Sequence, residues 1–257
     1  MADGDSAPDV GCALVTSNSA ALPVIAVDGP AGSGKSSTSR GVAAALGLRY
    51  LDTGAMYRAI TWAFLQRGID VSDSEAVATR VAEPELVMSV SPEGQSMLCD
   101  GVDVTTAIRS PEVTGAVSAV SAVPQVRSRL VALQQRSVLD ALEAGVGIVV
   151  EGRDIGTVVL PDARLKVFLT ADEAARAWRR ALEDARRAGS ESPEVEADAA
   201  ANEVRRRLAE RDAVDSGRAV SPLQAANDAI VIDGSALTLD EVVGRIVALA
   251  RERWSDV

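Results

Sequence analysis

Short apolar runs alternate with longer segments of helical periodicity over most of the chain. Residues 24–28 form an apolar run between Pro23 and Gly29, which is typical of a buried parallel strand. A glycine-rich turn follows, and then a helix over 35–46 ends at Gly47. Similar patterns predict strands over 49–52, 147–150, 165–169 and 229–232, and helices over 55–67, 171–211 (with a turn at 189–193) and 239–253. This alternation predicts an α/β fold in which helices wind around both faces of a five-stranded parallel sheet.

The alternation is interrupted between residues 85 and 105. Short apolar runs over 86–90, 96–99 and 102–105 are separated by turn residues such as Asp100-Gly101. They predict a small antiparallel β insertion. Two helices are expected after it, over 111–122 and 124–143.

The two ends of the chain carry little pattern. Residues 1–22 contain several aspartates and no basic residue, so they predict a flexible tail and not a secretory signal. No apolar run reaches the roughly 18 residues that span a membrane. Cys12 and Cys99 are too few for a disulfide framework or a zinc site, which suits a reducing compartment. We therefore expect a cytoplasmic protein whose folded domain covers 23–253, with 254–257 as a C-terminal end.

The amino-acid composition of the chain excludes several catalytic mechanisms and binding functions. The 257 residues include no histidine, which excludes Ser-His-Asp catalysis and histidine-ligated zinc. The net charge of −11 argues against broad binding of duplex nucleic acid. Aromatic residues make up only 3% of the chain, too few for a surface that stacks single-stranded bases. We expect a monomer with small-molecule partners, no nucleic acid polymer and no membrane.

Residues 29–36, Gly-Pro-Ala-Gly-Ser-Gly-Lys-Ser, match the phosphate-binding P-loop pattern between a predicted strand and a predicted helix. The glycines allow backbone N–H groups to converge on an anion at a helix N-terminus. Lys35, which with Lys166 makes up the lysines of the chain, is expected to reach the β- and γ-phosphates, and the Ser36 hydroxyl to bind Mg²⁺. The expected ATP-binding residues are Gly29, Pro30, Ala31, Gly32, Ser33, Gly34, Lys35, Ser36 and Ser37.

A P-loop alone does not distinguish kinases from GTPases, ATPases or motor-like proteins. The Asn-Lys-x-Asp motif with which GTPases read guanine is missing, since Asn227-Asp228 near the last predicted strand lacks the lysine. These observations favour a small-molecule kinase. Such an enzyme needs cations around its acceptor, because the transferred phosphoryl group carries charge on its equatorial oxygens.

Three clusters of arginines and acids provide such cations. They are Asp-Thr-Gly-Ala-Met-Tyr-Arg over 52–58, Glu-Gly-Arg-Asp-Ile-Gly over 151–156, and Arg-Asp-Ala-Val-Asp-Ser-Gly-Arg over 211–218. Each is expected in a loop at a strand end, on the carboxyl side of the sheet where doubly wound folds bind their ligands.

With these motifs the chain resembles the bacterial cytidylate kinases, enzymes of the P-loop NTPase fold that phosphorylate CMP and dCMP with ATP. The resemblance extends from Pro23 to Arg253. It implies that the insertion at about 85–105 belongs to the monophosphate-binding region, that about 171–195 forms a helical lid, and that ATP acts with Mg²⁺. Two alternatives stay open. One is another small P-loop kinase acting on UMP, AMP or a shikimate-type alcohol, and the other is a nucleotide-binding switch without an acceptor.

The resemblance also implies roles for individual residues. The expected CMP-binding groups are Ser118, Arg127 and Asp154 for the cytosine edge, Thr53, Tyr57, Arg58 and Arg153 for the acceptor phosphate, and Arg211, Asp215 and Arg218 for the sugar and phosphates. Glu151 also lies in this site, where it either orients Arg153 or holds a metal-bound water. The expected catalytic residues are Lys35, Arg153, Arg176 and Arg180. Arg176 and Arg180 are four residues apart on one helical face, where the alternative is a set of surface ion pairs.

Overall fold

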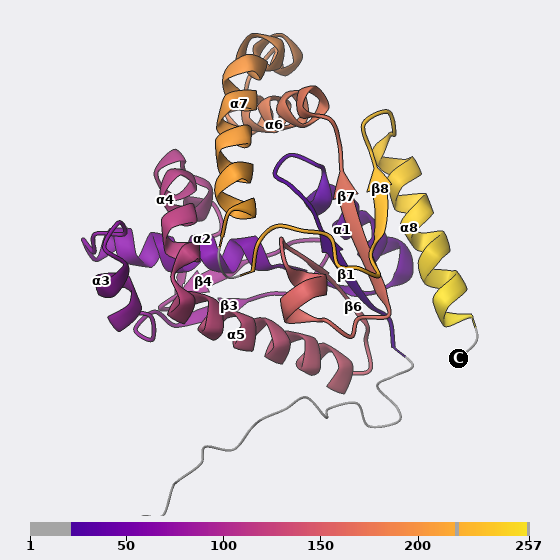
Figure 1. Ribbon diagram of the computed structural model, residues 1–257, viewed down its shortest axis with the longest axis horizontal. Coiled ribbons are helices and arrows are strands. Elements are labelled where there is room, and N and C mark those ends of the chain that lie inside the picture. Colours follow the sequence, from indigo (N-terminus) through magenta and orange to yellow (C-terminus); the bar gives the residue numbers. More distant parts are fainter. Residues whose placement is uncertain (1–21, 219–220, 256–257) are drawn as a thin grey trace, which may run out of the picture.

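The computed structural model describes residues 22–218 and 221–255. Within this part of the chain, a parallel sheet of five strands has the order β2-β6-β1-β7-β8, which confirms the predicted fold class. Its strands are β1 (Val24–Asp28), β2 (Arg49–Asp52), β6 (Ile148–Glu151), β7 (Leu165–Thr170) and β8 (Ile230–Asp233). Since β1 lies between β6 and β7, the P-loop that follows β1 sits at the middle of the carboxyl edge of the sheet (Figure 1).

Helices cover both faces of this sheet. The helices of the described residues are α1 (Lys35–Leu46), α2 (Thr53–Gln66), α3 (Ser74–Thr79), α4 (Pro111–Ala122), α5 (Pro124–Glu143), α6 (Glu173–Arg187), α7 (Pro193–Ser216) and α8 (Leu239–Trp254), with short helical turns η2 (Ala107–Arg109) and η3 (Ile155–Val159). Ile25 and Val27 of β1 pack in one apolar cluster with α1 and α8. Ala26, between them, packs on the opposite face with α5 and η3. The strand is therefore buried on both faces, as its continuous apolar run predicted.

The interruption between residues 85 and 105 is a second, antiparallel sheet. Its strands β3 (Leu86–Met88), β4 (Met97–Cys99) and β5 (Val102–Asp103) follow one another in that order, so the predicted insertion is confirmed with shorter strands. Met97 and Cys99 face an apolar cluster with Phe64 of α2 and Leu130 of α5. This packing fixes the insertion against α2 and α5.

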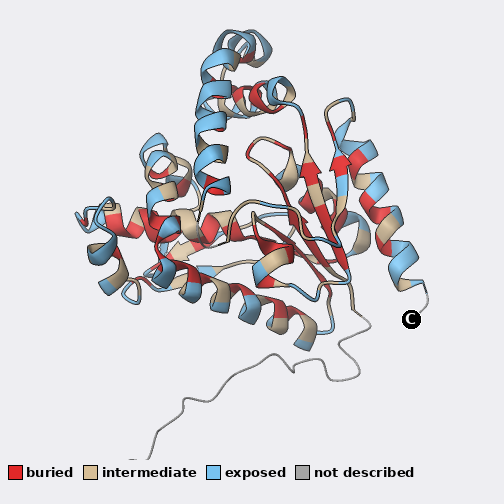
Figure 2. Cartoon of the chain, in the orientation of Figure 1, coloured by how far each residue is buried: buried red, intermediate tan, exposed pale blue. Residues whose placement is uncertain are grey.

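Helices α6 and α7 form a separate antiparallel pair at the top of Figure 1. Most of their outer surface is exposed, and the buried residues lie along the line where the two helices meet (Figure 2). Ala177, Leu182, Val204 and Leu208 form a small apolar cluster there that also includes Ala31 of the P-loop. The helix pair is thus packed directly onto the phosphate-binding loop.

The structure corrects one expectation about this region. Residues 211–216 do not lie in a loop, because α7 continues to Ser216 and ends at Gly217. The segment 194–216 contains neither glycine nor proline, so nothing in it stops the helix. The third cluster of arginines and acids therefore reaches the site from the carboxyl end of a long helix.

Smaller differences have local causes. Helix α2 begins at Thr53 and not at residue 55, because the Asp52 side chain accepts a hydrogen bond from Ala55 N at 3.0 Å and caps the helix. Helix α3 was not predicted. Of the predicted tail, residues 1–21 and with them Cys12 lie outside the described residues, as do 256–257 at the other end. No helix in the described part of the chain is long and apolar enough to cross a membrane.

Candidate active site

Acidic side chains line the carboxyl edge of the sheet beside the P-loop. Asp52 pairs in register with Glu151, and Glu151 with Val27, so the ends of β2, β6 and β1 lie next to one another. The P-loop packs closely against its neighbours. A Cβ on Gly29, which has a φ of 150°, would lie 2.0 Å from the carbonyl oxygen of Leu169. A Cβ on Gly32, with a φ of 75°, would lie 2.8 Å from the carbonyl oxygen of Arg176. Both glycines are therefore required for the loop to sit between β7 and α6.

Lys35, Ser36 and Glu151 meet at the base of the P-loop. Lys35 Nζ donates to the carbonyl of Pro30 at 2.7 Å, and Ser36 Oγ donates to Glu151 Oε1 at 2.7 Å. Burial and the neighbouring Arg153 lower the pKa of Lys35. Burial and the nearby Asp52 raise the pKa of Glu151. Of the remaining P-loop serines, Ser33 is buried and Ser37 is exposed.

The side-chain oxygens of Ser36 and Glu151 suit a magnesium ion that is also bound by phosphate oxygens of a substrate. Glu151 Oε2 is buried and has no hydrogen-bond partner among the described residues. No group of three or more acidic, cysteine or histidine side chains in the described part of the chain could hold a metal ion alone. Mg²⁺ is commonly held by one or two protein oxygens together with phosphate oxygens and water, so a hydroxyl beside a carboxylate with a free oxygen fits it.

Asp215 forms ion pairs with arginines from two of the predicted clusters. Its carboxylate is 2% exposed and pairs with Arg218, with Arg153 Nε at 3.2 Å and with Arg211 Nε at 3.9 Å. Arg153 Nη1 also donates to the carbonyl of Gly29 at 2.8 Å. Burial and the charge of Arg153 lower the pKa of Arg211. The structure therefore joins residues 151–156 and 211–218 next to the P-loop, although the chain separates them by some 60 residues.

Asp52 is the carboxylate that pairs with the arginine of the first cluster. It pairs with Arg58 at 2.9 Å and with Arg109 at 3.5 Å. Burial alone would raise the pKa of Asp52, but Arg58 and Arg109 lower it below the usual value. Thr53 Oγ1 donates to the carbonyl of Glu151 at 2.7 Å and so ties the start of α2 to the end of β6. Arg109, which sequence reasoning missed, reaches this site from η2.

Arg127 and Asp154 form a buried ion pair beside Tyr57. Their side chains are 6% and 8% exposed, and the Arg127 guanidinium lies 5.7 Å from the centre of the Tyr57 ring. Burial raises the pKa of Asp154, and the charge of Arg127 opposes this. Ser118 lies half-buried on α4, and its carbonyl accepts a hydrogen bond from the hydroxyl of Ser121 at 3.1 Å.

Ser121 is a second residue that sequence reasoning missed. Its carbonyl accepts from Arg127 at 3.4 Å and its hydroxyl accepts from Arg218 at 2.8 Å. It thereby connects the Arg127–Asp154 pair to the arginines around Asp215. The signal was present in the spacing, because Ser121 follows Ser118 by three residues and shares its helix face.

The two arginines predicted for the lid have different contacts, although both lie on α6. Arg176 is buried, donates to the carbonyl of Ala31 at 3.2 Å and pairs with Asp212. Arg180 pairs with Glu183 at 3.4 Å and Asp184 at 3.0 Å on its own helix. Its positive charge still contributes to the lowered pKa of Arg211.

Comparison with known proteins identifies the family. The family model described as cytidylate kinase matches residues 25–252. The chain belongs to the cytidylate kinase family. A cytidylate kinase of Streptomyces avermitilis is 52% identical over 230 residues, which cover 90% of this chain and 93% of that protein. A cytidylate kinase of Mycolicibacterium paratuberculosis is 51% identical over 231 residues, covering 90% and 96%. The predicted activity, an ATP-dependent phosphotransferase acting on CMP or dCMP, is confirmed by this membership.

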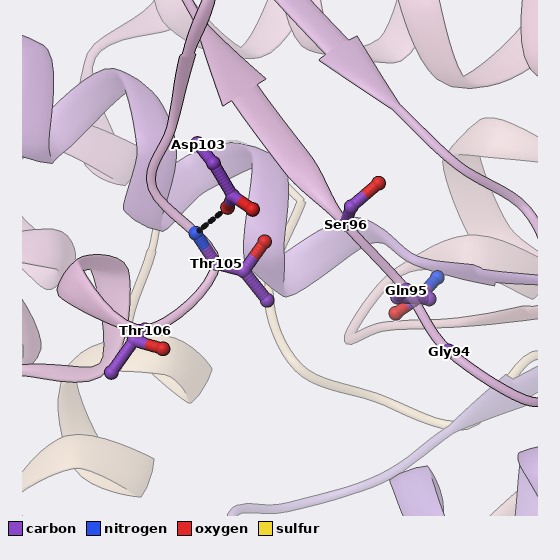
Figure 3. Close-up of a pocket in the computed structure, with 6 residues that line it drawn as sticks. All are labelled: Gly94, Gln95, Ser96, Asp103, Thr105 and Thr106. Carbon is purple, nitrogen blue, oxygen red and sulfur yellow. Dashed lines mark hydrogen bonds between the residues drawn. The ribbon is translucent and has the colours of Figure 1, made fainter.

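The described residues also form a hollow near the β insertion. Figure 3 shows it on the antiparallel sheet, where Asp103 accepts a hydrogen bond from Thr105 N at 2.9 Å. It has a volume of about 650 Å³ and is lined by Gly94, Gln95, Ser96, Asp103, Thr105 and Thr106. None of these residues belongs to the P-loop or to the three clusters.

Proposed function

We propose that CMP or dCMP binds between α4, the turn before η3 and the carboxyl end of α7, with its phosphate facing ATP at the P-loop. The contacts of Arg153 carry this proposal. Its guanidinium donates to Gly29 of the P-loop at 2.8 Å and pairs with Asp215 of the acceptor region at 3.2 Å. A cation that contacts both the P-loop and the acceptor region lies where a phosphoryl group would pass from ATP to the acceptor.

ATP binds along the P-loop and the N-terminus of α1, whose backbone N–H groups face the β- and γ-phosphates. Lys35 supplies a point charge to these phosphates, and their negative charge favours its protonated form against the effect of burial. Ser36 and Glu151 hold Mg²⁺, which neutralises charge on the phosphate oxygens. Glu151 is assigned to the metal because Arg153 has Asp215 and Gly29 as its partners.

The acceptor phosphate binds to Arg58 and Arg153, with Thr53 and Tyr57 beside it. Arg211, Asp215 and Arg218 bind the sugar and the phosphates. Before the substrate binds, Asp52 and Asp215 compensate the charge of these arginines, which could not otherwise be buried at low cost. A bound phosphate takes over part of this role and leaves a carboxylate oxygen of Asp215 to accept from a ribose hydroxyl.

The cytosine edge is read by Arg127 and Asp154 with Ser118. Cytosine presents a carbonyl and a ring nitrogen as acceptors and an exocyclic amine as a donor. Arg127 donates to the acceptors, and the Asp154 carboxylate accepts from the amine. Uracil offers a carbonyl where cytosine has its amine, so the buried Asp154 carboxylate discriminates against UMP.

The reaction proceeds by positioning and electrostatics without a covalent intermediate. An oxygen of the CMP phosphate attacks the γ-phosphorus of ATP. The bond from that phosphorus to the β,γ-bridging oxygen breaks, and ADP leaves with the electron pair. The attacking oxygen is already anionic, so no general base is required. Lys35, Arg153, Arg176 and Arg180 stabilise the charge of the transferred group, the last two from a lid over about 171–195.

A panel of acceptors tests this proposal. ADP release from ATP and Mg²⁺ is measured with CMP, dCMP, UMP, AMP and shikimate, and we expect the highest kcat/KM with CMP or dCMP. A higher value with UMP, AMP or shikimate would assign the site to another small P-loop kinase. Slow hydrolysis that no acceptor changes would indicate a nucleotide-binding switch.

Both proposed substrate sites are built by one chain, so the reaction requires neither a second copy nor a nucleic acid polymer. We expect a cytoplasmic monomer, and sedimentation velocity with and without ATP and CMP measures the oligomeric state. Sedimentation as a dimer that is needed for turnover would contradict this expectation.

A further inference from the structure

Asp212, which none of these steps uses, joins the P-loop to the helix pair α6–α7. Its Oδ1 accepts a hydrogen bond from Ala31 N at 3.2 Å, and its Oδ2 pairs with Nη1 of Arg176. Arg176 donates in turn to the carbonyl of Ala31 at 3.2 Å. Both backbone polar groups of Ala31 are therefore bound to one ion pair, with one partner on each helix.

This ring of contacts is largely shielded from water. The side chains of Arg176 and Asp212 are 10% and 17% exposed, and Ala31 lies in the apolar cluster with Leu208. The close approach of Gly32 to the backbone of Arg176 leaves little room for the loop to move separately from α6. A low dielectric strengthens an ion pair in such a position, so the carboxylate of Asp212 restricts the guanidinium to one geometry.

We infer that Asp212 is a positioning residue that holds Arg176 at the P-loop in line with the transferred phosphoryl group. The inference rests on the catalytic role of Arg176 proposed above. The contacts to Ala31 and Asp212 use Nη1 of Arg176, so its Nη2 group stays available to a phosphate after Asp212 has set the orientation of the guanidinium.

The position of Asp212 on α7 connects this role to the acceptor site. Asp215 follows it by three residues and pairs with Arg153. One end of one helix therefore orients two arginines, Arg176 through Asp212 and Arg153 through Asp215. Without Asp212, the long side chain of Arg176 regains rotamer freedom, and the cation is misaligned although it is still present.

The test compares Asp212→Asn with Arg176→Ala and with the double variant. Asparagine keeps an oxygen for Ala31 N and removes the charge that holds Arg176. We expect kcat to fall roughly 10- to 100-fold, the effect of misplacing a catalytic group by about 1 Å. The KM for ATP should not rise, because a negative charge near the phosphates has been removed. The double variant should have the kcat of Arg176→Ala alone, since Asp212 acts through that arginine.

Glu203→Gln is the matched control. It also removes one negative charge from α7, but Glu203 is exposed and pairs with Arg206 on the outer side of the helix. We expect its kcat and KM values to match the wild type. Asp212→Glu keeps the charge and displaces it by one methylene, so it should lower kcat in the wild-type background and leave kcat unchanged in the Arg176→Ala background. These two measurements decide the question if Asp212→Asn does not fold.

The outcomes separate this inference from the proposed function. If Arg176→Ala loses kcat and Asp212→Asn does not, the inference is wrong and the proposed site stands. Losses that multiply in the double variant would also overturn it, because Asp212 would then act independently of Arg176. If Arg176→Ala keeps full kcat with CMP, the catalytic role of Arg176 is wrong, and the inference is wrong with it.

Discussion

Removal of the Asp154 carboxylate tests base recognition and buried electrostatics in one variant. In Asp154→Ala the guanidinium of Arg127, with a side chain that is 6% exposed, loses its counter-ion. Breaking a buried ion pair in this way costs about 3–5 kcal/mol of the free energy of unfolding. Arg127 keeps the carbonyl of Ser121 at 3.4 Å and the ring of Tyr57 at 5.7 Å. We therefore expect a loss at the lower end, about 3 kcal/mol.

The same variant should lose its preference for cytosine. The exocyclic amine of CMP no longer finds an acceptor at Asp154, and one buried hydrogen-bonded polar pair is worth about 1–3 kcal/mol. This range corresponds to a decrease of roughly 5- to 150-fold in the ratio of kcat/KM for CMP to kcat/KM for UMP. The ratio is measured by ADP release with each acceptor under identical conditions.

A double variant separates the two effects. Arg127→Met combined with Asp154→Ala removes both charges, so no uncompensated ion stays buried, and part of the lost stability should return. The preference for CMP should stay lost, because the groups that read the base are gone. Urea unfolding followed by tryptophan fluorescence measures the stability of each protein. An unchanged CMP preference in Asp154→Ala would show that the base is read elsewhere. A double variant as unstable as the single one would refute the role of the buried charge.

Three further predictions concern the P-loop, a buried acid and the acceptor phosphate. Lys35→Ala should lower turnover by about 10³- to 10⁵-fold in the ADP-release assay, while Lys166→Met, which removes the other lysine, keeps turnover per folded molecule. Burial raises the pKa of Asp28 to about 6, so native Asp28 binds a proton more tightly than the unfolded chain does. Wild-type stability should consequently fall by about 2 kcal/mol relative to Asp28→Asn as the pH rises from about 4 to above 6, and parallel urea profiles of the two proteins would contradict this. Arg58→Ala should raise the KM for CMP by roughly 10- to 100-fold with little change in the KM for ATP, and equal increases in both would argue against a role at the acceptor phosphate.

The elements predicted best are those whose limits are set by local chemistry. β1 over Val24–Asp28 and α1 over Lys35–Leu46 have the predicted bounds, because Pro23, Gly29 and Gly47 interrupt the pattern next to them. The turn at Asp100-Gly101 was visible because both residues adopt a positive φ, which favours this pair. Helix α3 and the turn η3 were missed, since they are short and depend on packing more than on periodicity.

For the candidate site, the sequence showed which residues carry charge but not which of them pair. Arg153 was expected near the acceptor phosphate, and the structure adds that it pairs with Asp215 and reaches Gly29. Arg109 belongs to no motif, Ser121 is indicated only by its spacing from Ser118, and Asp212 lies in the third cluster, which does not show its partner. Their contacts depend on where η2, α4 and α7 pack, so the sequence does not show which groups they bind.

The sequence by itself determined the phosphate-binding chemistry, because a P-loop is a local structure. Its glycines, its lysine and the start of the helix that follows lie within residues 29–36, and these residues supply the backbone N–H groups that bind an anion. Only the tertiary structure decided how a chain with a net charge of −11 builds a site for two anions. Each buried arginine of the site lies beside a carboxylate, as in Arg127 with Asp154 and Arg176 with Asp212. These partners lie 27 and 36 residues apart in the chain, and packing brings them together because a buried charge without a counter-ion would destabilise the fold.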